Sequence, residues 1–180
     1  MFLMDVDNFL YVNKNYGHIA GDHVICRLAD VIRSHIETTA FMCRVSGDEF
    51  AVFYQEEGSE EWMRKMAEAF KEDFHKAVDH KLSLSIGITS TRNPLERCKD
   101  LLQYCDKALY YVKRNGKNSY QILERDTDEF LDSQDKGFQI DMAQLKSRLT
   151  EEKPAIGAYS VDYGNFEKIY RLIARSLSRN

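Results

Sequence analysis

Long apolar segments are absent from this sequence. No run approaches the roughly 20 consecutive apolar residues that a membrane-spanning helix needs, and the apolar start at Met1 ends at Asp5, too early for a signal peptide. We therefore expect a soluble, cytoplasmic segment that has no membrane contact.

An excess of positive charge is also absent. The chain carries 25 Lys and Arg against 29 Asp and Glu, which gives a formal net charge of -4. Such a surface repels the phosphates of a nucleic-acid polymer at long range, so we expect no partner of that class. Small anions remain possible ligands where a metal ion binds them locally.

Cysteine pairs and histidine pairs with metal-ligand spacing are missing as well. The 4 cysteines form no CxxC motif, and the 5 histidines show no ligand pattern, so a zinc site is not expected. The cysteines stand in apolar contexts, where a free thiol behaves as a small hydrophobic group. They are Cys26, Cys43, Cys98 and Cys105.

The overall composition is typical of a globular protein. Apolar types make up 43% and charged types 30% of the 180 residues, which fits one main domain and an appendage. Alternating or continuous apolar runs predict strands over residues 2–6, 41–45, 49–54, 82–89 and 119–123. Amphipathic spacing predicts helices over residues 18–36, 60–78 and 95–112, the last closed by Gly116.

This order predicts an α/β (α+β) sandwich whose helices flank a mixed sheet, with a hairpin supplying the antiparallel part. An acidic linker is expected over residues 125–137 and a C-terminal extension over 138–180. Within the extension we expect helices at 138–149 and 166–177 and a strand at 155–161. Two alternatives are open: the extension packs back on the domain, or it begins a second, degenerate domain.

Acidic and basic residues gather at three separated places. Asp5 and Asp7 follow the first strand, residues 46–50 form the hairpin turn, and residues 113–117 follow the third helix. Carboxylates from a strand end and a nearby turn suit Mg²⁺, which takes its remaining ligands from water and substrate phosphate. One Asp-x-Asp pair is a weak signal, but the combination indicates a site for a nucleoside triphosphate.

Four ordered motifs show a resemblance to a known family: LMDVDNFLYVNKNYGHIAGD, RVSGDEFAVF, LSIGIT and CDKALYYVKRNGKNSY. Through them residues 1–124 resemble the GGDEF domain of diguanylate cyclases. The resemblance implies an adenylyl-cyclase-like catalytic domain that works as a homodimer. Each subunit would present one GTP, and each ribose 3′-hydroxyl would attack the partner's α-phosphate, giving cyclic di-GMP and pyrophosphate.

The resemblance also implies roles for acidic residues. Asp5, Asp48, Glu49 and the Val6 carbonyl would bind Mg²⁺ or Mn²⁺, with Asp48 and Glu49 as the catalytic residues. Glu49 would act either as a metal ligand or in activating the attacking hydroxyl. Loss of a metal-binding aspartate should nearly abolish the chemistry.

Substrate-binding roles follow in the same way. Asn13 and Asp22 would recognise guanine, and Lys113 and Lys117 would hold the terminal phosphates. Ser46 and Gly47, in the hairpin turn, would also bind substrate by lying beside the phosphates of GTP. Simpler alternatives remain open, because Asn and Asp often cap helices and lysines often solvate a helix end.

The sequence departs from the family pattern at several positions. Ser46 replaces the first glycine of the signature, and Lys117 replaces an arginine that would orient phosphate better. The family's inhibitory RxxD motif would fall on residues 37–40, which lack both of its charged residues, so tight product feedback there is not expected. The usual leading helix and DxLTGLxNR segment are also expected to be missing.

The turn at Ser46 decides how much the first departure matters. In a type II turn only Gly47 needs a positive φ, serine is tolerated, and Ser46→Gly is expected to change turnover by less than about threefold. In a type II′ turn Ser46 would be strained, and the same change would raise turnover roughly tenfold. The competing function is a silent module that binds GTP or a protein and regulates a neighbour.

Overall fold

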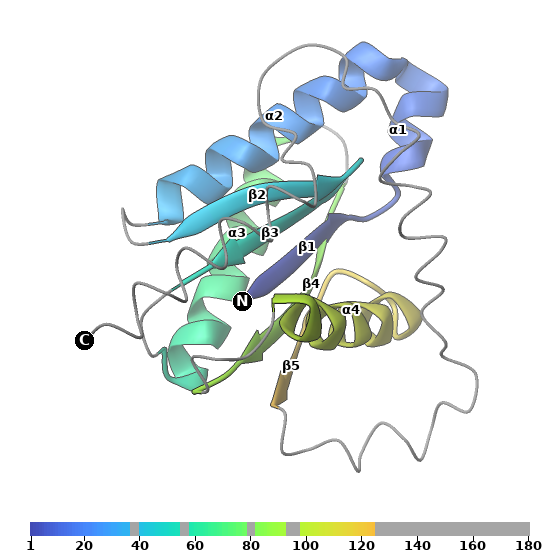
Figure 1. Cartoon of the computed structure of the whole chain (residues 1–180). Coiled ribbons are helices and arrows are strands. Elements are labelled where there is room, and N and C mark those ends of the chain that lie inside the picture. Colours follow the sequence, from blue (N-terminus) through green and yellow to red (C-terminus); the bar gives the residue numbers. More distant parts are fainter. Residues whose placement is uncertain (37–39, 55–57, 79–81, 93–97, 125–180) are drawn as a thin grey trace.

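The computed structural model describes residues 1–36, 40–54, 58–78, 82–92 and 98–124. They form a five-stranded mixed sheet with helices on both faces, as the sequence predicts (Figure 1). The strands are β1 (Phe2–Val6), β2 (Phe41–Ser46), β3 (Glu49–Phe53), β4 (Leu84–Ser90) and β5 (Tyr120–Glu124). The linker and extension predicted after residue 124 lie outside the described residues.

Strand β1 occupies the centre of the sheet, whose order is β2-β3-β1-β4-β5. It pairs antiparallel with both β3 and β4, while β4 and β5 run parallel. The antiparallel part is therefore larger than the predicted hairpin. As a consequence, the carboxyl end of β1 shares one edge of the sheet with the β2–β3 turn and with the starts of β4 and β5.

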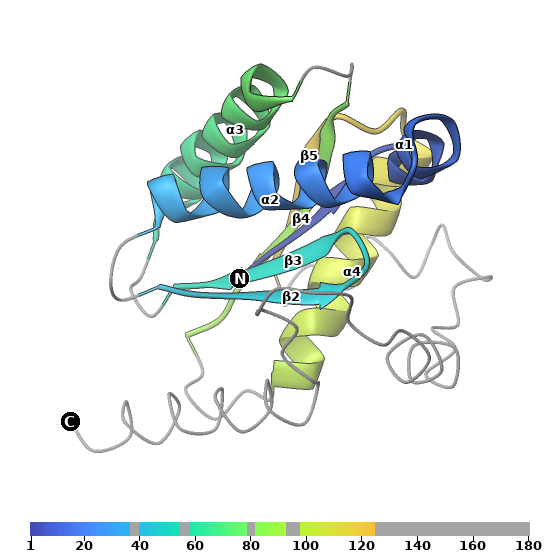
Figure 2. The same ribbon diagram turned by 90° about the horizontal axis from the view of Figure 1, so that it is seen from above.

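Helices α2 (His18–His35) and α3 (Glu60–Ala77) cover one face of the sheet (Figure 2). Side chains alternate along a strand, so Phe2, Met4 and Val6 all point toward these two helices. The Phe2 ring packs edge-on against Phe70 of α3, with 5.9 Å between ring centroids. The larger hydrophobic core therefore lies on this side.

Helix α4 (Cys98–Arg114) covers the opposite face. Leu3 and Ala51 belong to the smaller apolar cluster there, with Cys105 and Leu109 of the helix. Gly87 of β4 lets the helix approach closely, since a Cβ at this position would lie 2.0 Å from the Cys105 carbonyl oxygen. This contact sets how closely α4 packs against the sheet.

A short helix, α1 (Phe9–Tyr16), follows β1 and was not predicted. Only Val12 of this helix is buried, and Asn8 at its start has a left-handed backbone without a side-chain capping bond. The segment thus has neither a wide apolar stripe nor a capping signal, which are the features that indicate a helix in a sequence.

The cysteines differ from one another more than expected. Burial raises the pKa of the Cys43 and Cys105 thiols to about 12, so both stay protonated and act as core groups. Cys98 is buried too, but Cys26 is exposed on α2, and the prediction that it lies in an apolar context is wrong.

Across the described ranges, no helix combines the length and apolar character that crossing a membrane requires.

The α4–β4 contact makes a testable prediction. Gly87→Ala should lower the free energy of unfolding by about 2 to 4 kcal/mol, because the added methyl meets backbone atoms that cannot move independently. Chemical denaturation followed by circular dichroism measures this. Ser90→Ala, at the end of the same strand, is the control and should change stability by less than about 1 kcal/mol. Equal effects of the two changes would show that α4 does not depend on Gly87.

Candidate active site

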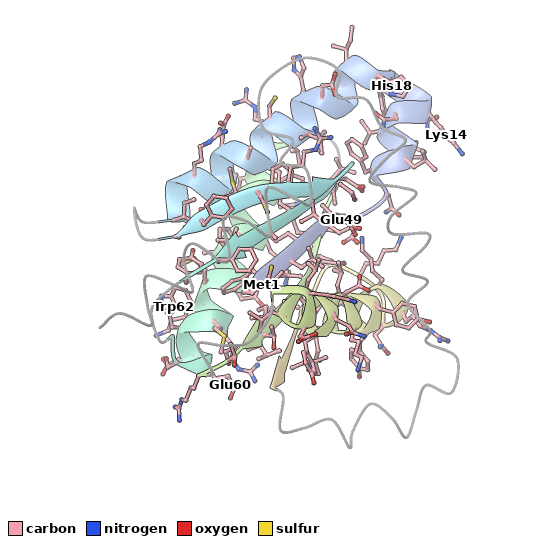
Figure 3. The ribbon with its side chains drawn as sticks, viewed as in Figure 1. Met1, Lys14, His18, Glu49, Glu60 and Trp62 are labelled. Atoms are coloured by element: carbon pink, nitrogen blue, oxygen red, sulfur yellow. The ribbon has the colours of Figure 1, made fainter. Side chains whose placement is uncertain are left out.

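The candidate site lies at the edge of the sheet where β1 ends. Asp5 in β1 stands opposite Glu49, the first residue of β3, in the strand register. The Val6 amide donates to the Asp48 carbonyl oxygen at 3.4 Å, which joins the end of β1 to the hairpin turn. Figure 3 shows Glu49 at this edge, with Lys14 and His18 farther away on α1 and α2.

The Asp7 carboxylate is the most fully hydrogen-bonded group in the site. It is buried, with an exposed fraction of 0%, and accepts bonds from the hydroxyls of Ser83 at 2.7 Å and Ser85 at 2.8 Å. It also accepts from the Asn118 amide at 3.0 Å and from the Lys113 ammonium at 2.7 Å. Asp7 therefore ties the end of β1 to β4, to α4 and to the turn before β5.

The Lys113 ammonium donates to both Asp5 and Asp7. Burial alone would lower the pKa of Lys113, but the two carboxylates outweigh it and raise the pKa above its ordinary value. For Asp7, burial works toward a higher pKa, yet the bonds from Lys113 and the two serines hold the pKa below its ordinary value. Both groups therefore remain charged at neutral pH.

Asp5 is in a different electrostatic position. Its pKa is raised from 3.8 to about 6, mainly by burial, with a smaller rise from the charges of Glu49 and Asp7, while Lys113 acts in the opposite direction. Without a bound cation, a pKa near 6 means that a large share of the Asp5 carboxyl groups is protonated at pH values below neutral. The ionised Asp5 carboxylate is destabilised by its surroundings, and a bound cation would stabilise it. Asp5 is therefore suited to act as a ligand of a cation.

The hairpin turn consists of Gly47 and Asp48 between the paired residues Ser46 and Glu49. Neither Ser46 nor Gly47 is among the described residues with positive φ, so the expected type II turn is wrong. A type I turn, which needs no positive φ, is consistent with this backbone. Serine is therefore tolerated at this position for a different reason from the one predicted.

Two side chains hold this turn. The Arg44 guanidinium donates to the Gly47 carbonyl oxygen from Nε at 2.8 Å and also from Nη2. The Ser46 hydroxyl donates to Oε2 of Glu49. This second bond was not predicted, since the sequence indicates only that Ser46 lies near the phosphates. It means that Ser46 directs a carboxylate of the candidate site.

The oxygen donors at this edge fit a Mg²⁺ or Mn²⁺ ion. Asp5, Asp48 and Glu49 supply carboxylates, and Val6 supplies a carbonyl, all from adjacent strand ends. In the part of the chain that the structure describes, no three acidic, histidine or cysteine side chains are close enough together to enclose a metal by themselves. Mg²⁺ does not require this, because it usually keeps waters and takes further oxygens from phosphate.

Asn13 and Asp22 lie in two consecutive helices that follow β1. Asn13 is inside α1 and Asp22 inside α2, whose N-cap is Gly17, so the alternative that these two side chains cap helices is wrong. Asp22 is exposed. The Asn13 Oδ1 atom is buried and has no hydrogen-bond partner within the described structure. A buried acceptor without a partner is costly, so a donor from a ligand would be favourable there.

Lys117 lies in the turn between α4 and β5. Gly116, Lys117 and Asn118 all have positive φ, and the Lys117 ammonium donates to Oδ1 of Asn8 at 2.8 Å. The predicted stop of α4 at Gly116 is confirmed, with φ 108°. This turn carries Lys117 toward the end of β1, on the same side as Lys113.

Asp7 is the residue of the site that sequence reasoning missed. The sequence groups it with Asp5 as a carboxylate at a strand end and predicts no structural role for it. The available signal was its position directly after β1, in which every residue except Asp5 is apolar, because a carboxylate that turns inward there needs several donors.

Comparison with known proteins agrees with this geometry. Residues 1–119 match the model of the diguanylate cyclase GGDEF domain. Because this match covers most of the chain, the protein belongs to the GGDEF family.

The match to each relative covers only part of that relative's length. Diguanylate cyclase A of Treponema denticola is 32% identical over 128 residues, which are 66% of this chain and 33% of that protein. The active GGEEF domain of a diguanylate cyclase from Vibrio cholerae superposes with a TM-score of 0.60 at 32% identity, over 67% of this chain and 80% of that one. The coiled coil and GGDEF domain of DgcB from Caulobacter crescentus, in complex with c-di-GMP, gives a TM-score of 0.62 at 25% identity, over 68% of each chain.

The raised pKa of Asp5 predicts how stability depends on pH. Between pH 4 and 7 the metal-free folded state binds more protons at Asp5 than the unfolded state does, so stability falls as pH rises through this range. The shift from 3.8 to about 6 corresponds to a loss of up to about 3 kcal/mol in this one contribution. Thermal unfolding in EDTA between pH 5 and 8 should show a smaller loss for Asp5→Asn than for the wild type.

Asp30→Asn provides the control for this experiment. Asp30 is 62% exposed on α2 and pairs with Arg33, so its removal should leave the pH dependence between 5 and 8 unchanged. Identical pH profiles for the wild type and Asp5→Asn would contradict the electrostatic description of Asp5.

Proposed function

We propose that this domain is a diguanylate cyclase, which condenses two GTP molecules into cyclic di-GMP and releases two pyrophosphates. One observation carries the proposal: Asp5 at the end of β1 stands opposite Glu49, the residue after Asp48 at the β2–β3 turn, and accepts a hydrogen bond from the Lys113 ammonium. This supports a site that combines carboxylates for a metal with a cation for phosphate. The chain spans 33% of the T. denticola cyclase, so the activity of the whole protein is part of this proposal.

The acidic residues and the Val6 carbonyl would hold Mg²⁺ or Mn²⁺. Such an ion neutralises charge on the attacking and leaving oxygens of phosphoryl transfer. Asp5 and Asp48 contribute oxygens from a strand end and from a turn, which keeps them on a rigid frame. Glu49, oriented by the Ser46 hydroxyl, either contributes a further oxygen or accepts the proton of the attacking ribose hydroxyl.

The two lysines would bind the terminal phosphates. Lys113 is anchored by Asp7, so its ammonium stays at the edge of the sheet while Asp5 turns to a cation. Lys117 adds a second point charge from the neighbouring turn. Lysine orients phosphate less strictly than an arginine fork, and weaker GTP binding than in arginine-containing relatives should follow.

Asn13 and Asp22 would recognise the base. Guanine offers N–H donors on its Watson–Crick edge, and the Asn13 carbonyl and Asp22 carboxylate are acceptors. The buried Asn13 Oδ1 would gain the partner that it lacks within the domain. Adenine presents an acceptor where guanine has its ring N–H, so the same pair would disfavour ATP.

The reaction needs two subunits. One domain presents one GTP, whose 3′-hydroxyl attacks the α-phosphate held by the partner, forming a phosphodiester and releasing pyrophosphate. A second attack in the opposite direction closes the ring. We therefore propose a homodimer as the active form, acting in the cytoplasm, where GTP is available.

A silent regulatory module is the second candidate function. It is favoured by the pairing within the site, since Lys113 is bound to Asp5 and Ser46 to Glu49. If these bonds persisted with GTP present, the domain would bind nucleotide without turning it over. Product analysis distinguishes the two functions.

Incubation of the wild-type protein with GTP and Mg²⁺, followed by chromatography, should yield cyclic di-GMP. Asp48→Ala should reduce the rate at least about a thousandfold, because the loss of a metal carboxylate removes several kcal/mol of stabilisation from charge on the phosphates. Glu61→Ala is the control, since Glu61 is exposed on α3 and pairs with Lys65 on the same helix. GTP binding without any product in the wild type would select the regulatory module.

Ser46 gives a prediction that differs from the one drawn from turn types. Ser46→Ala and Ser46→Gly both remove the bond to Glu49, and neither relieves a positive φ. Both should lower turnover by a similar factor, roughly three- to tenfold, which corresponds to one hydrogen bond. Initial rates at saturating GTP measure this. A rise in turnover for the glycine variant alone would show that the serine crowds the phosphates.

A further inference from the structure

Gly21 is a glycine within the regular part of α2, where this residue is the least favourable after proline. Its φ is not positive, so the backbone does not require a glycine there. The residue is buried, and its amide bonds back to the Gly17 carbonyl at 3.3 Å. The reason for glycine must therefore lie in what surrounds its Cα.

The neighbour of Gly21 is the Asn13 side chain. A Cβ on Gly21 would lie 1.9 Å from Asn13 Oδ1, a distance that no real contact allows, and 3.0 Å from Asn13 Cγ, so the Asn13 amide would have to move. The next atom, Cζ of Phe9, is 3.1 Å away and belongs to a ring that has to give by only a few tenths of an ångström. The space left by the missing Cβ is thus occupied by the Asn13 amide.

This placement explains the unpartnered state of Asn13 Oδ1. The atom is buried against α2 and has no hydrogen-bond partner among the described residues. The α2 residue that follows Gly21 is Asp22, so the glycine contacts one of the two acceptors proposed for guanine and precedes the other in sequence. We infer that Gly21 is a positioning residue for base recognition, whose missing Cβ sets where the Asn13 amide lies. This rests on the proposed function of Asn13.

The test is a double-mutant cycle of Gly21→Ala and Asn13→Ala, with Asp30→Ala, an exposed position farther along α2, as the control. Affinities for 3′-deoxyGTP and 3′-deoxyATP are measured with Mg²⁺, because these probes lack the attacking hydroxyl. Gly21→Ala should reduce the ratio of guanine to adenine affinity about tenfold or more. In the Asn13→Ala background the added Gly21→Ala should change this ratio by less than about twofold.

A second readout is independent of nucleotide. Gly21→Ala should lower the melting temperature when Asn13 is present and lower it less, or raise it, when Asn13 is alanine. If Gly21→Ala unfolds the domain and the double variant folds, the steric link is supported. If the double variant unfolds as well, or both backgrounds lose the same number of degrees, the link to Asn13 is overturned.

The outcomes separate the two claims. If Asn13→Ala removes the preference for guanine while Gly21→Ala retains it, the role of Gly21 is wrong and the guanine site stands. If the wild type has no preference for guanine, or Asn13→Ala leaves that preference unchanged, the guanine site fails, and the inference about Gly21 fails with it.

Discussion

The ion pair between Asp7 and Lys113 joins the stability of this domain to its chemistry. A buried carboxylate is costly unless charge and hydrogen bonds compensate it, and here Ser83, Ser85, the Asn118 amide and Lys113 do so together. These donors come from three other parts of the chain. A change at Asp7 would therefore disturb the packing of the sheet edge and the position of Lys113, the lysine proposed to bind phosphate, at the same time. The proposed phosphate site would in this sense be part of the frame of the protein.

The topology explains why these groups meet. Strand β1 is central and antiparallel to both neighbours, so its carboxyl end lies beside the start of β3 and the start of β4. Helix α4 brings Lys113 to the same edge, and the contact with Gly87 sets how closely the helix packs against the sheet. The proposed metal ligands at residues 5–6 and 48–49 and the proposed phosphate ligands Lys113 and Lys117 thus come from three segments far apart in sequence. Asp5, Glu49 and Lys113 lie in regular secondary structure, whereas Asp48 and Lys117 lie in turns.

Much of this arrangement could be predicted from the sequence. Within the described residues, apolar periodicity located the five strands and the three long helices, since each buries a regular stripe, and the acidic residues stood out because they lie at strand ends. Helix α1 was missed because it buries one residue. The turn type was missed because glycine permits several backbone conformations. The bond from Ser46 to Glu49 and the fit of Asn13 against Gly21 depend on distances that no spacing rule contains.

The distribution of thiols has a practical consequence. Cys43, Cys98 and Cys105 are buried, whereas Cys26 is exposed on α2, four residues after Asp22. Four residues are about one helical turn, so the two side chains lie on the same face. A thiol-reactive fluorophore would therefore modify the native domain at Cys26 before the buried cysteines. The protein carries its own attachment point for a dye within about 6 Å of Asp22, the residue proposed to recognise guanine, and with that role nucleotide occupancy could be followed optically without engineering the sequence.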